Sequence, residues 1–319
     1  MDRDTDLLHE LAPVAEQLLE RHLAHAKEWF PHELVPWSLG RDFEADEEWD
    51  PAQAPMDEAV RSALFVNLLT EDNLPHYFRT INGLFGIDDA WGAWSNRWTA
   101  EEGRHAIVIR DYLTVTRSVD PVALERGRMF QVSSGEVPQP ESVVDGLVYV
   151  TLQELATRIS HGNTGRLLAD RRGRDVMARV AGDENLHHVF YRDATSAVLE
   201  LDPSSVVLAI DRQVRGFEMP GTAIPNFAAH AKAIAHAGIY DFANHHDRIL
   251  KPVVLGHWRL ESLEGLSPEA EQARTRVIDY ITRVGKAARR IAGRRQTRLD
   301  VADAADVAAA TGTRDPALV

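Results

Sequence analysis

Two short stretches of the sequence carry residue types that bind metal ions. Each places a glutamate three residues before a histidine, Glu102 and His105 in the first and Glu184 and His187 in the second. Residues three apart lie on the same face of a helix, so each pair can bind one metal ion through a carboxylate and an imidazole. The sequence therefore predicts a metal centre built from two helices that face each other.

Another glutamate precedes each pair in apolar surroundings. Glu71 lies 31 residues before Glu102, and Glu154 lies 30 residues before Glu184. About 13 helical residues cover ~20 Å, so each spacing allows one helix to reach a turn and a second helix to return. Two such hairpins form a bundle with four carboxylates and two imidazoles inside. This pattern is typical of ferritin-like proteins with two iron or two manganese ions, and it suits those metals better than zinc.

The periodicity of apolar residues predicts an all-α protein, a ferritin-like four-helix bundle with additional flanking helices. Helices are predicted over 5–25, 56–85, 89–117, 141–170 and 173–200, and further helical patterns cover 206–217, 224–237, 240–260 and 268–290. The bundle core spans about 56–201, and the flanking helices span 204–292. Residues 1–298 form a single domain. Residues 299–319, without aromatic side chains, are expected to be a disordered tail.

Proline and glycine mark where these elements end. Pro75 lies four residues after Glu71, and its ring clashes with the carbonyl group of that residue. The helix over 56–85 is therefore expected either to kink at Glu71 or to stop near Asn73. Residues 118–140 contain several Pro, Gly and Ser residues and are expected to connect the two hairpins.

Composition excludes several classes of function. The 319 residues include no cysteine, which rules out disulfides, a thiolate zinc site, a cysteine nucleophile and an iron–sulfur cluster in this chain. A net charge of −14 argues against nucleic-acid binding. No apolar run approaches the roughly 18 residues that a membrane span needs, so we expect a cytoplasmic protein. No dinucleotide-binding, phosphate-binding or nucleophile-elbow motif is present.

The residues around the metal-binding pairs resemble a known family. WTAEEGRH (98–105) and AGDENLH (181–187) are similar to the two [DE]-E-x-x-H motifs of the acyl-acyl-carrier-protein desaturases. The stretches 70–75, 153–157 and 160–164 resemble that family as well, and the likeness covers about 5–292. The resemblance implies that Glu102 and Glu184 bridge two iron ions, with manganese as a possible substitute. Each ion is then completed by one further pair, Glu71 with His105 and Glu154 with His187.

The resemblance also implies roles for residues beside the ligands. Asp183 would orient His105, and Trp29 would lie beyond it on the side where electrons enter. Thr157 would face the oxygen-binding side and assist proton delivery. The family usually has Asn where this chain has Gly103, and a glycine inside a helix costs about 1 kcal/mol relative to Ala. That departure concerns local helix rigidity and rate, because the ligands themselves are intact.

The activity implied is oxidative removal of two hydrogens from adjacent methylenes of an acyl chain carried on acyl carrier protein, with O2 as the oxidant. Such a substrate needs a narrow apolar channel. Gly146 leaves room for a chain beside the third bundle helix, and Thr80, Gly83 and Leu84 would line the opposite wall. Close helix packing is the alternative explanation for Gly146. The alternative functions are another di-iron oxygenase, such as an amine or hydrocarbon hydroxylase, and a ferritin-like iron-storage or redox-sensing protein.

Three expectations concern partners. The resemblance implies a homodimer packed through 56–85 and 89–117. Activation of O2 needs electrons, yet the chain has neither an iron–sulfur ligand set nor a dinucleotide motif, so a ferredoxin-type donor is expected. The basic series over 283–298 is either a solvated helix face or a docking patch for an acidic partner.

Overall fold

The computed structural model describes residues 3–44, 46–218, 221–222 and 224–311, and within these ranges the chain is helical without strands. The α-helices are α1 (Arg3–His25), α2 (Pro31–Leu34), α3 (Glu58–Glu71), α4 (Leu74–Phe85), α5 (Asp89–Val115), α6 (Pro121–Ser134), α7 (Val143–Leu167), α8 (Arg171–Leu201), α9 (Pro203–Arg215), α10 (Phe227–His236), α11 (Phe242–His245) and α12 (Pro268–Thr311). A π-helix, η3 (His246–His257), follows α11, and the 3-10 turns are η1 (Trp37–Leu39), η2 (Pro51–Gln53) and η4 (Leu260–Ser262).

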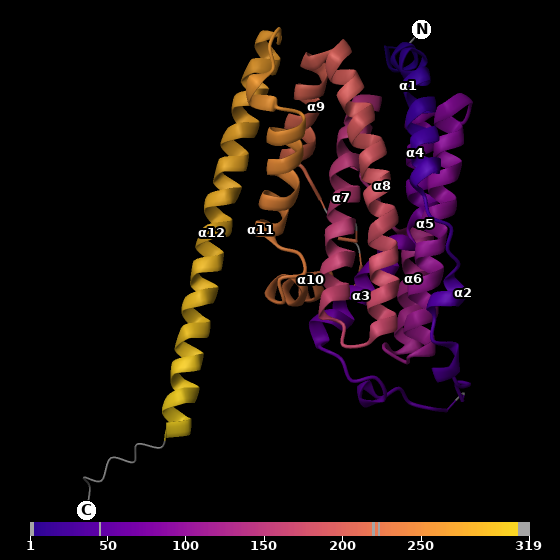
Figure 1. The fold of residues 1–319 in the computed structure, drawn as a ribbon, viewed down its shortest axis with the longest axis vertical. Coiled ribbons are helices and arrows are strands. Elements are labelled where there is room, and N and C mark those ends of the chain that lie inside the picture. Colours follow the sequence, from indigo (N-terminus) through magenta and orange to yellow (C-terminus); the bar gives the residue numbers. More distant parts are fainter. Residues whose placement is uncertain (1–2, 45, 219–220, 223, 312–319) are drawn as a thin grey trace, which may run out of the picture.

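Four helices form the core of the bundle. The α7 helix packs against α8, α5 packs against both α3 and α8, and α3 also contacts α7. Figure 1 shows α7 and α8 running side by side through the middle of the molecule. The predicted inward faces are buried: on α5, Trp98, Ile109 and Tyr112 lie in the core together with Glu102 and His105. The prediction of an all-α bundle with flanking helices is confirmed.

The predicted helix over 56–85 is two helices. The α3 helix ends at Glu71, and α4 begins at Leu74 with Pro75 in its first turn. Proline fits the first turn of a helix, where its missing N–H group has no helical partner, whereas it would break a continuous helix at this point. Of the two expectations, termination near Asn73 is the one observed. Glu71 is therefore the last residue of α3 and stays buried in the bundle.

The segment 118–140 connects the hairpins but also contains α6, which the periodicity did not predict. Asp120 precedes this helix and its side chain accepts a hydrogen bond from the backbone N–H of Val122. Pro121 occupies the first turn. An aspartate cap followed by proline favours a helix start. The α6 helix then packs on α3 and α4.

The last part of the chain braces the bundle. The α9 helix packs on α7 and α8, and α12 packs along α9. The predicted helix over 240–260 divides into α11 and η3, and Pro252 lies inside η3. The α12 helix runs to Thr311, past residue 298 where the disordered tail was expected to begin; this stretch is rich in Ala, a strong helix former. Residues 312–319 lie outside the described ranges. None of the described helices combines the length and apolar composition needed to cross a membrane.

Candidate metal centre

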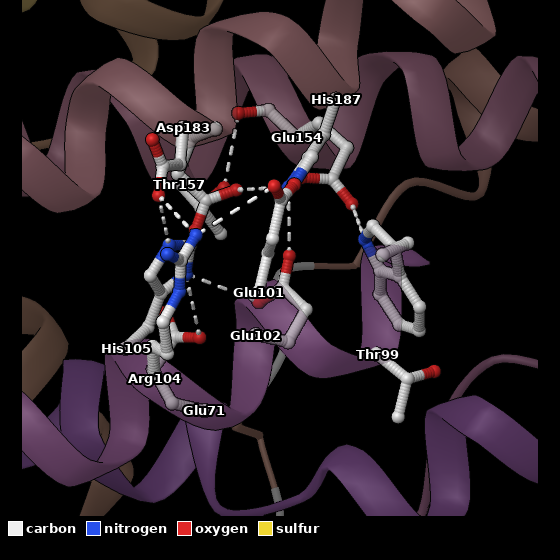
Figure 2. Close-up of polar contacts among 12 residues, drawn as sticks. Glu71, Thr99, Glu101, Glu102, Arg104, His105, Glu154, Thr157, Asp183 and His187 are labelled. Carbon is white, nitrogen blue, oxygen red and sulfur yellow. Dashed lines mark hydrogen bonds and ion pairs between the residues drawn. The ribbon is translucent and has the colours of Figure 1, made fainter. Parts of the chain in front are cut away.

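The six metal-ligand candidates converge at the centre of the bundle. Figure 2 shows carboxylates and imidazoles pointing toward one another, from α3 and α5 on one side and α7 and α8 on the other. All six are buried, and both histidine side chains are fully enclosed. Their donor atoms form two groups in which all atoms lie within 4.8 Å of one another: Glu71, Glu102, His105 and Glu184 in one, and Glu102, Glu154, Glu184 and His187 in the other.

Glu102 and Glu184 belong to both groups because each presents one oxygen to each histidine. Oε2 of Glu102 lies 3.4 Å from Nδ1 of His105, and its Oε1 lies 2.9 Å from Nδ1 of His187. For Glu184, Oε1 is 3.4 Å from Nδ1 of His105 and Oε2 is 3.8 Å from Nδ1 of His187. This geometry places both carboxylates between the two histidines, in the part that the two donor groups share.

Glu71 and Glu154 each serve one group only. Oε2 of Glu71 lies 3.7 Å from Nδ1 of His105, and Oε2 of Glu154 lies 3.6 Å from Nδ1 of His187. The second oxygen of Glu154 accepts a hydrogen bond from the indole N–H of Trp98 at 3.1 Å. Each of these two glutamates thus directs one oxygen toward a ligand histidine. Its other oxygen contacts a residue outside the six candidates, Trp98 for Glu154 and His161 for Glu71.

Several atoms at this centre have no hydrogen bond of good geometry among the described residues. They are Nδ1 of His105 and His187 and one oxygen of each of three carboxylates, Glu102, Glu154 and Glu184. Buried polar atoms without partners are rare in folded proteins, and an ion at their centre is one of the few explanations. Four carboxylates with two neutral imidazoles also balance the charge of two divalent cations. The residues present therefore fit a pair of metal ions.

The electrostatics point the same way. Burial, together with the charges of Glu184 and Glu102, raises the pKa of Glu154 well above its usual range. Burial also acts to raise the pKa of Glu184, but the nearby imidazoles of His105 and His161 outweigh it and lower the pKa well below the ordinary value. Carboxylates this close together repel each other when all are ionised, and bound cations remove that repulsion.

The residues predicted beside His105 lie beside it. Asp183 is buried, and its Oδ2 accepts a hydrogen bond from the indole N–H of Trp29 at 2.8 Å. Nε2 of His105 lies 3.5 Å from the same oxygen. The Trp29 and His105 rings are nearly parallel, with centroids 6.4 Å apart, and the Arg104 guanidinium lies 4.8 Å from the Trp29 ring centroid. The geometry suits an orienting role for Asp183, which stays a prediction.

The corresponding support for His187 was missed by the sequence analysis. Oε2 of Glu101 lies 2.9 Å from Nε2 of His187 and 2.9 Å from Nε2 of His22. Its Oε1 accepts a hydrogen bond from Nε of Arg97 at 2.7 Å. The acidic residue before Glu102 was a usable signal, because Glu101 holds the same position in its motif as Asp183 does in the other.

His161 is a second residue that the analysis did not assign to the site. Its Nε2 lies 2.9 Å from Oε1 of Glu71 and 3.6 Å from Oε1 of Glu184. The signal was its place on the same helix face as Glu154 and Thr157. The Thr157 hydroxyl is buried and donates to the backbone carbonyl of Glu154 at 3.0 Å, so its role in proton delivery stays a prediction.

The four predicted channel residues lie in two places, at the contact between α4 and α7 and in a surface pocket. A Cβ atom at Gly146 would lie 2.8 Å from Cδ1 of Leu84, so this glycine lets α4 pack closely on α7. Close packing was the alternative explanation for Gly146. Thr80, Gly83 and Leu84 line a surface pocket of about 580 Å³ with the 135–140 segment, where Oγ1 of Thr80 accepts a hydrogen bond from Gln139 at 3.0 Å. The described residues thus hold Leu84 against Gly146, and the channel stays a prediction.

Gly103 lies beside Glu102 on α5 and has no heavy atom within 4 Å of the position that a Cβ would take. Packing therefore does not require a glycine here, and its cost remains that of a flexible residue inside a helix.

Comparisons with known proteins agree with this geometry. The family model described as fatty acid desaturase matches residues 3–307. The putative acyl-[acyl-carrier-protein] desaturase DesA1 of Mycobacterium tuberculosis is 43% identical over 307 residues, which cover 93% of this chain and 90% of the relative. The chloroplastic stearoyl-[acyl-carrier-protein] 9-desaturase of Ricinus communis is 30% identical, covering 89% of this chain and 75% of the relative.

A solved structure extends the likeness to three dimensions. The X-ray structure of the putative acyl-ACP desaturase DesA2 from M. tuberculosis H37Rv aligns with a TM-score of 0.67 at 28% sequence identity. The alignment covers 84% of this chain and 99% of that chain, so the all-helical, ferritin-like fold is shared. From the family match, the sequence identities and the common fold together, we conclude that this chain belongs to the fatty acid desaturase family.

Proposed function

We propose that this protein is an oxidoreductase that desaturates an acyl chain carried on acyl carrier protein at a centre of two iron ions. Two hydrogens leave adjacent methylenes, a carbon–carbon double bond forms, and O2 is reduced to two waters with two further electrons and two protons. The observation that carries the proposal is the pair of buried donor groups that share Glu102 and Glu184. The names of the curated relatives supply the reaction and the carrier.

In this proposal Glu102 and Glu184 would hold both ions. Glu71 and His105 would complete one position, and Glu154 and His187 would complete the other. The support is geometric, because each shared carboxylate already turns one oxygen to each histidine. Iron, with manganese as a substitute, suits this set of oxygen and imidazole ligands. When bound, the metal pair supplies the binding and activation of O2.

The chain's own residues orient the ligands and exclude water. Asp183 holds the His105 ring so that Nδ1 faces the carboxylates, and Trp29 fixes Asp183 from the side on which we place electron entry. Trp98 holds the outer oxygen of Glu154. Thr157 lies one turn after Glu154 and would assist proton delivery by turning its hydroxyl from the helix carbonyl to the centre.

Products from acyl-carrier thioesters test this function. Iron-loaded protein with an electron donor and O2 is given thioesters of different chain lengths, and the acyl products are analysed by mass spectrometry. We expect one double bond at a fixed position for the preferred length. The Glu102→Ala variant, assayed in parallel, serves as the inactive control. Hydroxylated acyl products in place of an alkene would contradict the proposal and favour the oxygenase alternative.

We further propose a homodimer, which the family resemblance implies, and a location in the cytoplasm; both stay predictions. Apolar side chains on α5 and α6 are exposed, namely Ile107 at 51%, Met129 at 69% and Phe130 at 45%. Large apolar residues exposed on neighbouring elements often mark an interface. Sedimentation at micromolar concentration should give the dimer mass, and Met129→Glu should shift the distribution toward monomer. A monomer in the unmodified protein at that concentration would count against the dimer.

A further inference from the structure

One N-terminal stretch supports the histidines of both metal positions. His22 lies in the last turn of α1, and Trp29 follows that helix. Trp29 donates to Asp183, which faces His105, whereas His22 lies against Glu101, which faces His187. Each buried carboxylate thus stands between one ligand histidine and one residue from this stretch.

The contacts of His22 are those of a buried residue with a specific partner. Its side chain is 4% exposed, and its Nε2 lies 2.9 Å from Oε2 of Glu101. The His22 and His187 rings stack with centroids 5.8 Å apart, and the Trp94 ring meets His22 edge-on at 5.0 Å. The ring is therefore held by aromatic neighbours as well as by the carboxylate.

The hydrogen-bond pattern determines which nitrogen of His187 faces the metal position. An ionised carboxylate only accepts hydrogen bonds, so Glu101 requires an N–H group at Nε2 of both histidines. In its neutral, metal-binding form His187 then carries the lone pair on Nδ1, the atom that lies among Glu102, Glu154 and Glu184. Hydrogen bonds of this kind fix the tautomer and the orientation of metal-binding histidines.

The other oxygen of Glu101 contacts two arginines that reach the surface. Its Oε1 pairs with Arg97 and lies 3.6 Å from Arg104, and the side chains of these arginines are 37% and 23% exposed. Among the described residues, Oε2 contacts His187 and His22, so His22 is the partner that keeps this oxygen in place besides the ligand itself. Without it, Glu101 can rotate toward the two arginines and release Nε2 of His187.

We propose that His22 is a positioning residue for His187, acting through Glu101, so that α1 controls the metal position formed with Glu154 but not the one formed with Glu71. The inference rests on the proposed function, because it assumes that His187 binds a metal ion. It assigns to α1 a role in the centre although this helix provides none of the ligands.

A matched pair of substitutions tests this role. His22→Gln places an amide N–H group near the original Nε2, whereas His22→Asn places its amide near Nδ1, which has no hydrogen-bond partner among the residues that the structure describes. Both variants keep a polar side chain. His25→Ala is the control, because His25 is exposed on the same helix and, within the described part of the chain, its side chain forms a hydrogen bond only with the backbone carbonyl of Arg21, at 2.7 Å.

Iron retention under a competing chelator and Mössbauer spectra of iron-loaded protein are the readouts. For His22→Asn we expect one of the two ions to bind about 10- to 100-fold more weakly, as is typical when the partner of a ligand is lost. One of the two iron signals should change and the other should stay. His22→Gln should restore most of the affinity, and His25→Ala should match the unmodified protein. Thermal unfolding of the metal-free variants is measured alongside, so that packing lost with the ring, which is greater for the shorter Asn side chain, is separated from an effect on the metal position.

Two outcomes separate this inference from the proposed function. If the unmodified protein binds two ions and His22→Asn retains both with unchanged affinity and signals, the positioning role is rejected while the proposed function stands. If the unmodified protein binds no ion pair, the proposed function itself fails. Equal losses in the Asn and Gln variants, with both signals altered, would show a general packing effect and would also reject the role.

Discussion

Replacing Glu184 with Ala is expected to remove metal from both positions and to abolish turnover. Glu184 turns one oxygen to His105 at 3.4 Å and the other to His187 at 3.8 Å, so its loss takes a ligand from each donor group. Glu154 belongs to only one group, and Glu154→Ala should impair that position and uncouple the pair. Removing a ligand should lower the metal affinity by more than the roughly 10- to 100-fold that is typical when a residue hydrogen-bonded to a ligand is removed.

Elemental analysis per chain and steady-state product formation check this expectation. We expect two ions in the unmodified protein, close to one in Glu154→Ala and fewer in Glu184→Ala, with activity falling in the same order. Glu200→Ala is a matched control, because Glu200 is an exposed glutamate on the same helix. Two tightly bound ions, or full activity, in Glu154→Ala would contradict the assignment of ligands.

The ligand pattern was predictable because it lies within regular helices. Glu102 and His105 on α5, like Glu184 and His187 on α8, sit at helical spacing on apolar faces, and the helices carry them inward. The shared spacing of the two hairpins then places the ligands of all four helices at the same level along the bundle axis. The helical spacing of the residues was therefore sufficient to predict which side chains are the metal-ligand candidates.

The residues that orient the ligands could not be derived in that way. His22 and Glu101 are separated by 79 residues, and His161 and Glu71 by 90 residues. Such contacts depend on how α1 and α7 are rotated against their neighbours, which no local period specifies. Asp183 and Trp29, 154 residues apart, were named only through the family resemblance.

The fold differed from the prediction at three places where local backbone features determine where a helix begins, ends or changes type. The gap between α3 and α4 depends on one proline, and the sequence allowed both a kink and a stop. The α6 helix is only weakly amphipathic, so its apolar residues show no clear helical period and the segment was predicted to be a connection. The cap by Asp120 is a local signal for a helix start that an analysis of periodicity does not include. The π-helical hydrogen bonds of η3 likewise have no simple sequence pattern.

The first residues of the basic series on α12 have described side chains. The side chains of Arg283, Lys286, Arg289 and Arg290 are exposed, and none of these four forms an ion pair in the described part of the chain. The remaining arginines of the series, from Arg294 on, have side chains outside the described set. A docking role for this face therefore stays a prediction, alongside the alternative of a solvated helix face.

The surface beside Trp29 is a second candidate for docking of the predicted electron carrier. Arg104 lies over the Trp29 ring and 3.4 Å from Asp183, and Arg179 lies 3.5 Å from the other oxygen of Asp183. Their side chains are 23% and 22% exposed, so positive charge reaches the surface directly above the His105 side of the centre. Opposite charge at such a place speeds the encounter of two proteins. We therefore favour this region for electron entry.

Sustained turnover is expected only with a separate electron carrier. Each desaturation needs two electrons, yet the chain has no cysteine to hold an iron–sulfur cluster and no dinucleotide motif to bind a nicotinamide. Iron-loaded protein with acyl substrate, O2 and reduced nicotinamide should therefore form many products per chain only when ferredoxin and its reductase are added. Chemically reduced protein alone should give at most one turnover, and the Glu184→Ala variant none. Multiple turnovers without the added carrier would show that electrons enter by another route and would overturn the prediction.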